Sequence, residues 1–132
     1  KLSGFTNAQG DILSEQKSIF SRIIDNEIPT EKIYEDDLAI VIEDIQPQAP
    51  THLLVIPKEP IPRLVDATKE QAMLLGHLLL VVGEVTRKLG LDDAFRLVIN
   101  NGEAAGQTVF HLHLHILAQT TLAESSIAKP FN

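Results

Sequence analysis

The 132-residue sequence contains no cysteine. Without cysteine the chain can form neither a disulfide framework nor a zinc ribbon, and it has no thiolate nucleophile. The absence of cysteine also suits a reducing compartment, so we expect a cytoplasmic protein. A chain of this length is nevertheless long enough for one domain that buries a continuous core without covalent or metal cross-links.

Basic residues are scarce, because eleven Lys and Arg residues are set against eighteen Asp and Glu residues. The formal net charge is −7. A domain that binds duplex nucleic acid usually presents a basic face, and the sequence has no cluster of Lys and Arg. We therefore expect no long nucleic acid as a partner. A small anionic ligand is compatible with this charge, because one local pocket can oppose the global field.

The sequence also has no long hydrophobic run. The longest apolar stretch, residues 72–82, has about 11 residues, whereas a transmembrane helix needs roughly 20. It is further interrupted by Gly76 and His77. We therefore expect no membrane partner.

The pattern of apolar residues predicts a flexible tail over residues 1–13 and a single α+β domain over residues 14–132. Ser14 is expected to cap a short helix that ends before Pro29, and residues 68–71 (TKEQ) form a capping box for a long helix. Gly90 is the expected stop of this long helix. Strands are predicted over residues 33–34, 38–42, 52–56, 95–100 and 109–117, with short links that favour antiparallel neighbours.

The long helix predicted over residues 68–89 is apolar on more than one face. A helix that covered only a sheet would need a narrower apolar stripe. We predict that this helix packs against both the sheet and a second subunit, and deep burial within a monomer is the alternative. The apolar residues are Leu74, Leu75, Leu78, Leu79, Leu80, Val81, Val82 and Val85.

Residues 107–117 (QTVFHLHLHIL) are the most informative segment. Side chains alternate between the two faces of a strand, and alternate residues lie about 6.5–7 Å apart. One face would then fill the core, with Phe110, Leu112, Leu114 and Ile116. The opposite face would present a row of three imidazoles, from His111, His113 and His115. Histidine is neither a good core filler nor a common strand former, so this row indicates a functional site. A lone His77 in the long helix is expected to be structural.

Two kinds of chemistry fit such a row. His-x-His on a strand is a zinc pattern, but three collinear rings cannot easily all reach one ion at about 2 Å, so a distant ligand would have to replace one of them. Phosphoryl and proton chemistry is the alternative, because histidine can be a nucleophile, a general acid or a charge stabiliser. The preceding loop favours an anion. Its Gly102 and Gly106 let backbone amides approach a phosphate, and Gln107 and Thr108 add side-chain donors.

The segment HLHLHIL at residues 111–117 matches the His-φ-His-φ-His-φ-φ signature of the histidine triad (HIT) family. The chain also resembles the Hint branch of that family, the nucleoside phosphoramidate hydrolases, over most of residues 18–117. This resemblance implies the HIT α+β fold, a homodimer with an antiparallel sheet, one long helix at the dimer interface and one short helix. The segments concerned are SIFSRIIDNEIP (18–29), EDDLAIVIEDIQPQAPTHLLVIPK (35–58), LLGHLL (74–79) and FRLVINNGEAAGQTVFHLHLH (95–115).

The resemblance also implies roles for the histidines. His113, the middle residue of the signature, would be the nucleophile that attacks the α-phosphorus. His115 would contact the phosphate or the leaving group. His111 is the first histidine of the signature, and His52, in the Pro-Thr-His segment, would support the triad.

The remaining site residues follow from the same resemblance. Asp44 would hold the ribose hydroxyls. The α-phosphate would bind at Asn100, Gly106, Gln107 and Thr108. The nucleobase pocket would consist of Ile19, Phe20, Ile23, Ile42 and Ile45.

The resemblance therefore predicts an enzyme that hydrolyses the P–N bond of purine nucleoside phosphoramidates, without a metal or other cofactor. A dinucleoside polyphosphate hydrolase of the Fhit type and a nucleotide-binding regulatory or scaffold protein are the alternatives. The sequence departs from the Hint pattern at several positions, and Glu43 stands at a variable position near the ribose. Thr108 replaces the usual Ser, Phe110 replaces the usual Tyr in what we interpret as a core change, and the residues after Leu117 lack the usual ending, which helps to select the leaving group.

Overall fold

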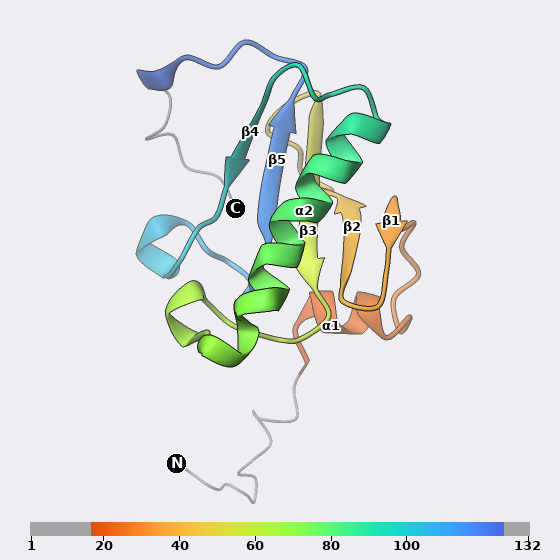
Figure 1. Cartoon of the computed structure of the whole chain (residues 1–132), viewed down its shortest axis with the longest axis vertical. Coiled ribbons are helices and arrows are strands. Elements are labelled where there is room, and N and C mark those ends of the chain that lie inside the picture. Colours follow the sequence, from red (N-terminus) through yellow and green to blue (C-terminus); the bar gives the residue numbers. More distant parts are fainter. Residues whose placement is uncertain (1–16, 126–132) are drawn as a thin grey trace, which may run out of the picture.

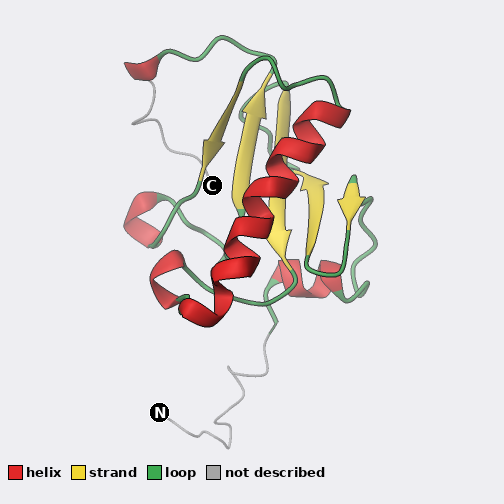
Figure 2. Cartoon of the chain, in the orientation of Figure 1, coloured by secondary structure: helices red, strands yellow, loops and turns green. Residues whose placement is uncertain are grey.

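The computed structural model describes residues 17–125. The tail predicted for residues 1–13 and the predicted Ser14 cap lie outside the described residues. Within the described part, one sheet is combined with one long and one short helix, as the sequence predicted (Figure 1). In chain order the elements are α1 (Ile19–Ile24), β1 (Tyr34–Glu35), β2 (Ala39–Glu43), β3 (Thr51–Pro57), α2 (Ala72–Lys88), β4 (Phe95–Val98) and β5 (Leu114–Ala118). Short 3-10 turns lie in the connections, outside the sheet (Figure 2).

The sheet has five strands in the order β1-β2-β3-β5-β4, and all neighbours are antiparallel. The last strand in sequence, β5, therefore lies inside the sheet between β3 and β4. His115 of β5 is opposite Leu54 of β3 and Val98 of β4. This arrangement buries the end of the histidine segment in the middle of the sheet.

The two faces of the sheet belong to two separate apolar clusters, because successive side chains of a strand point to opposite faces. Helix α2 crosses one face (Figure 1), where it packs on strand residues that include Val41, Leu53 and Leu114. Helix α1 contributes Phe20 and Ile23 to the cluster on the other face, which contains Ile40, Ile42, Leu54 and Ile56. The histidine residues lie on the α1 side of the sheet, so α1 is the element that shapes their surroundings.

Helix α1 begins at a polar cap, and a capping box lies in the 3-10 turn that precedes α2. The N-cap of α1 is Ser18, whose hydroxyl oxygen accepts the Ser21 amide hydrogen at 3.0 Å, whereas Ser14 was the expected cap. In the capping box before α2, the Thr68 amide donates to the Gln71 side chain at 2.6 Å. Helix α2 ends at Lys88, and Gly90 has a positive φ of 72°, which glycine adopts without strain.

The strand predicted over residues 109–117 is shorter in the structure, because β5 begins at Leu114. Residue 112 would pair with Pro57, which has no amide hydrogen and ends β3. The Leu112 amide instead donates to the Ile61 carbonyl at 2.7 Å. His111 and His113 therefore lie in an extended segment before the strand. Phe110, expected in the core, is 48% exposed, whereas the core positions of Leu112, Leu114 and Ile116 are confirmed.

Helix α2 buries one side and leaves apolar residues on the other. Its buried positions include Leu74, Leu78 and Val82, whereas Met73 and Leu80 are 88% and 74% exposed. Nε2 of His77 donates a hydrogen bond of 2.6 Å to the Asp36 carboxylate, which fits the structural role expected for His77. Among residues 17–125, no helix is both long and apolar enough to cross a membrane.

Candidate active site

Four histidines are brought together on the α1 side of the sheet. His52 lies on β3, His115 on the neighbouring β5, and His111 and His113 in the segment that leads into β5. Their exposed fractions are between 0% and 4%. The ring centroids of His113 and His115 are 4.9 Å apart, and those of His52 and His115 are 5.1 Å apart. A buried polar ring needs defined hydrogen bonds, so their partners determine their chemistry.

His111 bridges the end of β3 and the start of α1. Its Nε2 lies 2.8 Å from the Pro57 carbonyl oxygen, and its Nδ1 lies 2.9 Å from the Ser18 hydroxyl and 3.3 Å from the Ser21 hydroxyl. Because a carbonyl only accepts, Nε2 carries the hydrogen. Burial is the main cause that lowers the pKa of His111, and the nearby His113 lowers it further. The ring is therefore neutral near pH 7, and Nδ1 is an acceptor.

His113 has the opposite tautomer. Its Nδ1 lies 2.7 Å from the backbone carbonyl oxygen of His111, so Nδ1 is the donor. Burial again is the main cause that lowers the pKa of His113, so the ring is neutral and Nε2 holds a lone pair. The ring also meets the edge of Phe20, with centroids 4.9 Å apart. A neutral, fixed imidazole of this kind has the electronic state that a histidine nucleophile needs.

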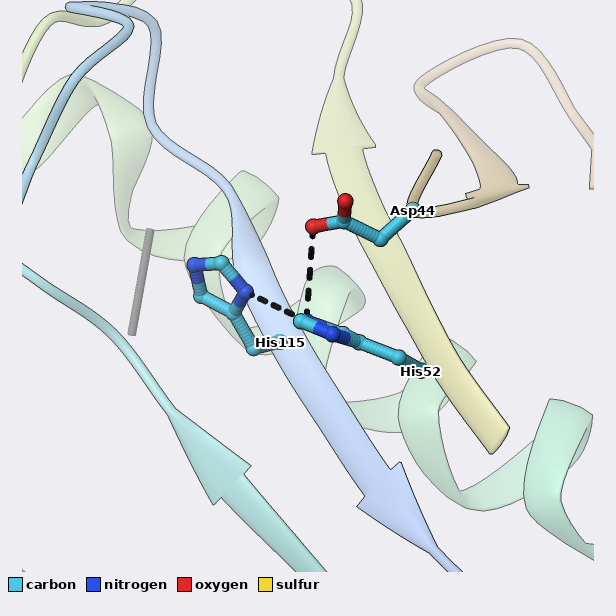
Figure 3. A group of neighbouring side chains, drawn as sticks. All are labelled: Asp44, His52 and His115. Atoms are coloured by element: carbon cyan, nitrogen blue, oxygen red, sulfur yellow. Dashed lines mark hydrogen bonds and ion pairs between the residues drawn. The ribbon is translucent and has the colours of Figure 1, made fainter. Parts of the chain in front are cut away.

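His52 and His115 form a directed pair (Figure 3). The His52 Nδ1 accepts the Gln48 amide hydrogen at 2.9 Å, so in the neutral ring Nε2 carries the hydrogen. This Nε2 lies 2.9 Å from Nδ1 of His115, and 3.5 Å from a carboxylate oxygen of Asp44. His115 then accepts at Nδ1 and, when neutral, carries its own hydrogen at Nε2. Burial lowers the pKa of His52 most strongly, Asp44 opposes this effect, and His113 adds to it.

Among the described residues, Asp44, His52 and His115 form the group of side chains that could hold a metal ion. The ligand atoms of Asp44, His52 and His115 all lie within 4.8 Å of one another. However, the two ring nitrogens are at hydrogen-bond distance, whereas two tetrahedral ligands at about 2.0–2.1 Å from zinc would be about 3.3–3.4 Å apart. An ion would therefore have to replace the His52–His115 hydrogen bond.

A cavity of about 500 Å³ opens beside His113 between α1 and the end of β2. All six residues predicted to contact the nucleoside line this cavity, namely Ile19, Phe20, Ile23, Ile42, Asp44 and Ile45. Thr108 and His113 line it too, so the predicted nucleophile faces the predicted nucleoside pocket. Ile45 is 91% exposed and therefore forms part of the rim rather than the floor. The Asp44 carboxylate is held by the Gln46 amide, which donates to it at 2.8 Å.

The glycine-containing loop is built differently from our expectation. The Gln107 side chain was expected to donate to a phosphate, but its amide nitrogen donates to the carbonyls of Pro62 and Val109, at 2.8 and 3.1 Å. Its oxygen accepts the Gly102 amide hydrogen at 2.7 Å. Gln107 therefore shapes the loop from within and has no spare side-chain donor.

The backbone of this loop is also hydrogen-bonded internally. The amides of Gly106 and Gln107 donate to the carbonyls of Glu103 and Gly102, both at 3.0 Å. Gly102 and Gly106 have φ values of 94° and 99°, which explains why glycine occurs there. Of the four residues predicted to bind phosphate, Thr108 alone is among the residues that line the cavity. Asn100, Gly106 and Gln107 lie in the connection between β4 and β5 that carries Thr108.

Several residues of this site were not predicted from the sequence. Ser18 and Ser21 contact His111, and Gln48 determines the tautomer of His52. Ser18 had a usable signal, since it is a serine directly before an apolar helical stripe, but Ser14, four residues earlier, was the predicted cap. The Gln48 contact is made by a backbone amide, for which side-chain identity gives no signal. The cavity is also lined by Ile28, Pro29, Thr30, Glu43, Gln46, Leu54 and Val109.

The chain is similar to known proteins in sequence and in fold. The family model described as "HIT domain" matches residues 25–122. An uncharacterized HIT-like protein of Synechocystis is 60% identical over 102 residues, which cover 77% of this chain and 90% of that protein. An uncharacterized HIT-like protein of Synechococcus elongatus is 52% identical over 108 residues, 82% of this chain and 95% of that protein.

Solved structures of HIT proteins are also similar to this chain. A HIT family hydrolase from Legionella pneumophila superposes with a TM-score of 0.79 at 36% identity, covering 82% of this chain and 97% of that one. A histidine triad protein from Clostridium difficile superposes with a TM-score of 0.77 at 38% identity, covering 80% and 93%. The chain belongs to the HIT family, and its structural neighbours include HIT family hydrolases.

Proposed function

We propose that this protein hydrolyses the P–N bond of purine nucleoside phosphoramidates through a nucleotidyl intermediate on His113. The observation that carries this proposal is the hydrogen bond of 2.7 Å from Nδ1 of His113 to the His111 carbonyl. It leaves the lone pair on Nε2, in a ring that lines the 500 Å³ cavity. The Hint-like segments of the sequence favour this substrate class over other nucleotides.

The first step is attack of Nε2 of His113 on the α-phosphorus. A P–N(His113) bond forms, and the bond between phosphorus and the substrate amine breaks. An amine leaves only when it gains a proton. The proposed source is Nε2 of His115 when the His52–His115 pair carries one additional proton, so that donation leaves two neutral rings. His52 lies 2.9 Å from the other nitrogen of His115 and keeps it oriented. Asp44, 3.5 Å from His52, favours positive charge on this pair.

The second step is hydrolysis of the intermediate. Water attacks the phosphorus, one of its protons returns to His115, and the P–N(His113) bond breaks. The products are the free amine, a nucleoside monophosphate and the regenerated enzyme, so atoms and protons balance. Thr108 lines the cavity, and we propose that its hydroxyl donates to the charged oxygens on phosphorus.

The cavity supports a nucleoside as the recognised part of the substrate. Its walls are mainly aliphatic and aromatic, which suits a stacked base, and Ile19, Phe20 and Ile23 of α1 form one wall. Asp44 offers two acceptor oxygens at the same cavity, which matches the two hydroxyls of a ribose. No cofactor is part of this proposal.

We further propose that the active protein is a homodimer. The outer side of α2 exposes Met73, Leu79 and Leu80, and β4 is an edge strand that exposes Phe95. Apolar exposure of this kind is typical of an interaction surface. Sedimentation at micromolar concentration is expected to show twice the 14.5 kDa chain mass, and a 14.5 kDa species alone would contradict the dimer.

The central test is chemical trapping of the intermediate. Adenosine 5′-phosphoramidate labelled at phosphorus is mixed with the enzyme and quenched within milliseconds, and mass spectrometry is expected to find adenylate on His113. Turnover is compared with that of diadenosine polyphosphates, whose faster cleavage would favour the Fhit-type alternative. Binding without turnover of either would favour the regulatory or scaffold alternative. Activity that is lost with a chelator and restored by zinc would favour the metal alternative.

A further inference from the structure

Helix α1 contacts the histidine row with its first turn. The Ser18 hydroxyl, which caps the helix, lies 2.9 Å from Nδ1 of His111. The Ser21 hydroxyl lies 3.3 Å from the same nitrogen. Both serines come from the helix whose other side lines the cavity. One short helix thus supplies a wall of the pocket and the hydrogen-bond partners of the first histidine.

The direction of these hydrogen bonds follows from what each group can do. The Pro57 carbonyl accepts from Nε2 of His111, so Nδ1 of the neutral ring needs a donor. The Ser18 hydroxyl has one hydrogen to give, and its oxygen meanwhile accepts the Ser21 amide hydrogen at 3.0 Å. A directed chain results, from the Ser21 amide through Ser18 and the ring of His111 to the end of β3. Such chains fix one tautomer and one ring orientation.

The position of His111 in turn affects the orientation of the proposed nucleophile, His113. Its carbonyl oxygen accepts the Nδ1 hydrogen of His113, so a shift of residue 111 changes the direction in which Nε2 of His113 points. The Phe20 ring of the same helix lies against both imidazoles, with centroid distances of 6.0 Å to His111 and 4.9 Å to His113. Phe20 also lines the cavity, so a bound base would press on the ring that supports the nucleophile.

We propose that Ser18, with Ser21 beside it, is a positioning residue that couples the nucleobase wall to the orientation of His113. A base that fills the cavity then holds α1 in place, and α1 holds His113 in line with the phosphorus. Binding energy from the base is in this way used in the chemical step, so the base raises kcat and not only affinity. This inference rests on the proposed function of His113 and adds the means by which the substrate's remote part affects its chemistry.

The test compares substitutions at position 18 on two substrates. Ser18→Ala is expected to lower kcat for adenosine 5′-phosphoramidate by about tenfold, the size of one hydrogen bond, with KM changed by less than about twofold. The kcat for ribose 5-phosphoramidate, which has no base, should fall much less. The rate advantage of the base is therefore expected to shrink in Ser18→Ala.

Three further variants separate catalysis from helix capping. Ser18→Thr retains the hydroxyl and should restore kcat. Ser18→Gly retains most of the helix-capping free energy but has no hydroxyl to donate to Nδ1 of His111, so it should keep a melting temperature close to that of the wild type and have a low kcat. Lys17→Ala is the matched control, because Lys17 pairs with Asp25 and Glu27 on the surface and should leave both rates unchanged. A Ser18→Gly protein with wild-type kcat, or a Ser18→Ala protein altered only in KM, would overturn the proposal.

A second measurement does not depend on turnover. Nitrogen NMR of the ring of His111 is expected to show an Nε2-protonated tautomer with a hydrogen-bonded Nδ1, and the Nδ1 signal should shift in Ser18→Ala but not in Ser18→Thr. If the wild-type enzyme turns over neither substrate, the proposed function fails, and this spectrum still tests the contact. An Nδ1 signal that is identical in wild type and Ser18→Ala would overturn the role of Ser18.

Discussion

The two faces of the central sheet differ in their polar content, because the α1 face combines an apolar cluster with four buried histidines. On the α2 face, Leu78, Val81 and their neighbours form an apolar cluster whose stability comes from burial and close packing. On the α1 face, buried imidazoles are held by hydrogen bonds whose directions fix each tautomer. The same strands serve both faces, because their side chains alternate. Stability should therefore depend mostly on the first face and catalysis on the second.

The largest effect that would test this division is the loss of the proposed nucleophile. His113→Ala should lower kcat at least a thousandfold, about 4 kcal/mol of transition-state stabilisation, because no other group can form the intermediate. Nucleotide binding, measured by calorimetry with AMP, should change little. The melting temperature should also stay close to that of the wild type. A variant that retains more than about a tenth of the rate would exclude His113 as nucleophile.

The matching test is a substitution on the α2 face. Leu78 is 1% exposed and packs in the cluster under α2, so Leu78→Ala should lower the free energy of unfolding by about 2–5 kcal/mol. Urea unfolding followed by circular dichroism gives this value. The folded fraction should retain wild-type kcat, because no group that contacts substrate is altered. Loss of kcat in a fully folded Leu78→Ala protein would show that the two faces are not separable.

What could be predicted from the sequence also differs between the two faces of the sheet. Alternation of apolar residues was enough to predict the α2 face, since Leu112, Leu114 and Ile116 all lie in its core. The alternation did not reveal where β5 begins, because a strand also needs a neighbour and β3 ends at Pro57. Phe110 lies beyond that point and is exposed.

The residues of the site could be predicted from the sequence, but the hydrogen bonds between them could not. The family signature indicated which histidines and which pocket residues to expect. The structure buries the four histidines on one side of the sheet, and it places His113 and the six predicted pocket residues at one cavity. Hydrogen-bond directions depend on backbone atoms such as the Gln48 amide and the Pro57 carbonyl, which no side-chain pattern specifies. For the same reason, Gln107 was expected to bind phosphate although its amide is used within the loop.

The dependence of stability on pH would sharpen the contrast between the faces. Burial lowers the pKa values of His52, His111 and His113 from the ordinary value of 6.5, so the unfolded chain binds protons that the folded chain does not. Stability should therefore be constant from pH 7.5 to about 6.5 and fall below it, by about 1.4 kcal/mol per pH unit for each such proton.

This pH dependence belongs to the histidine face alone. The Asp36 carboxyl, whose pKa its hydrogen-bond donors hold at about 2, affects stability only below its unfolded value of 3.8. Urea unfolding between pH 7.5 and 5 therefore isolates the histidines. Leu78→Ala should shift the whole curve downward without changing its slope, whereas His111→Gln should reduce the slope. A wild-type curve that is flat down to pH 5 would contradict buried neutral imidazoles.

The smallest expected effect concerns Asp44, at the point where the histidine network meets the cavity. Its carboxylate lines the cavity and also lies 3.5 Å from Nε2 of His52, so removal could act on the ribose or on the histidines. The two roles differ in their dependence on the substrate. If Asp44 holds the ribose hydroxyls, Asp44→Ala should weaken the binding of AMP by about tenfold, or ~1.4 kcal/mol, and hardly affect 2′,3′-dideoxy-AMP, which lacks the diol. If Asp44 acts through His52 alone, the binding affinity of both ligands should fall by the same factor. Asp44→Asn keeps one acceptor oxygen and should fall between wild type and Asp44→Ala for AMP. Calorimetric titration with both nucleotides decides between the roles, and equal losses would remove Asp44 from the ribose site.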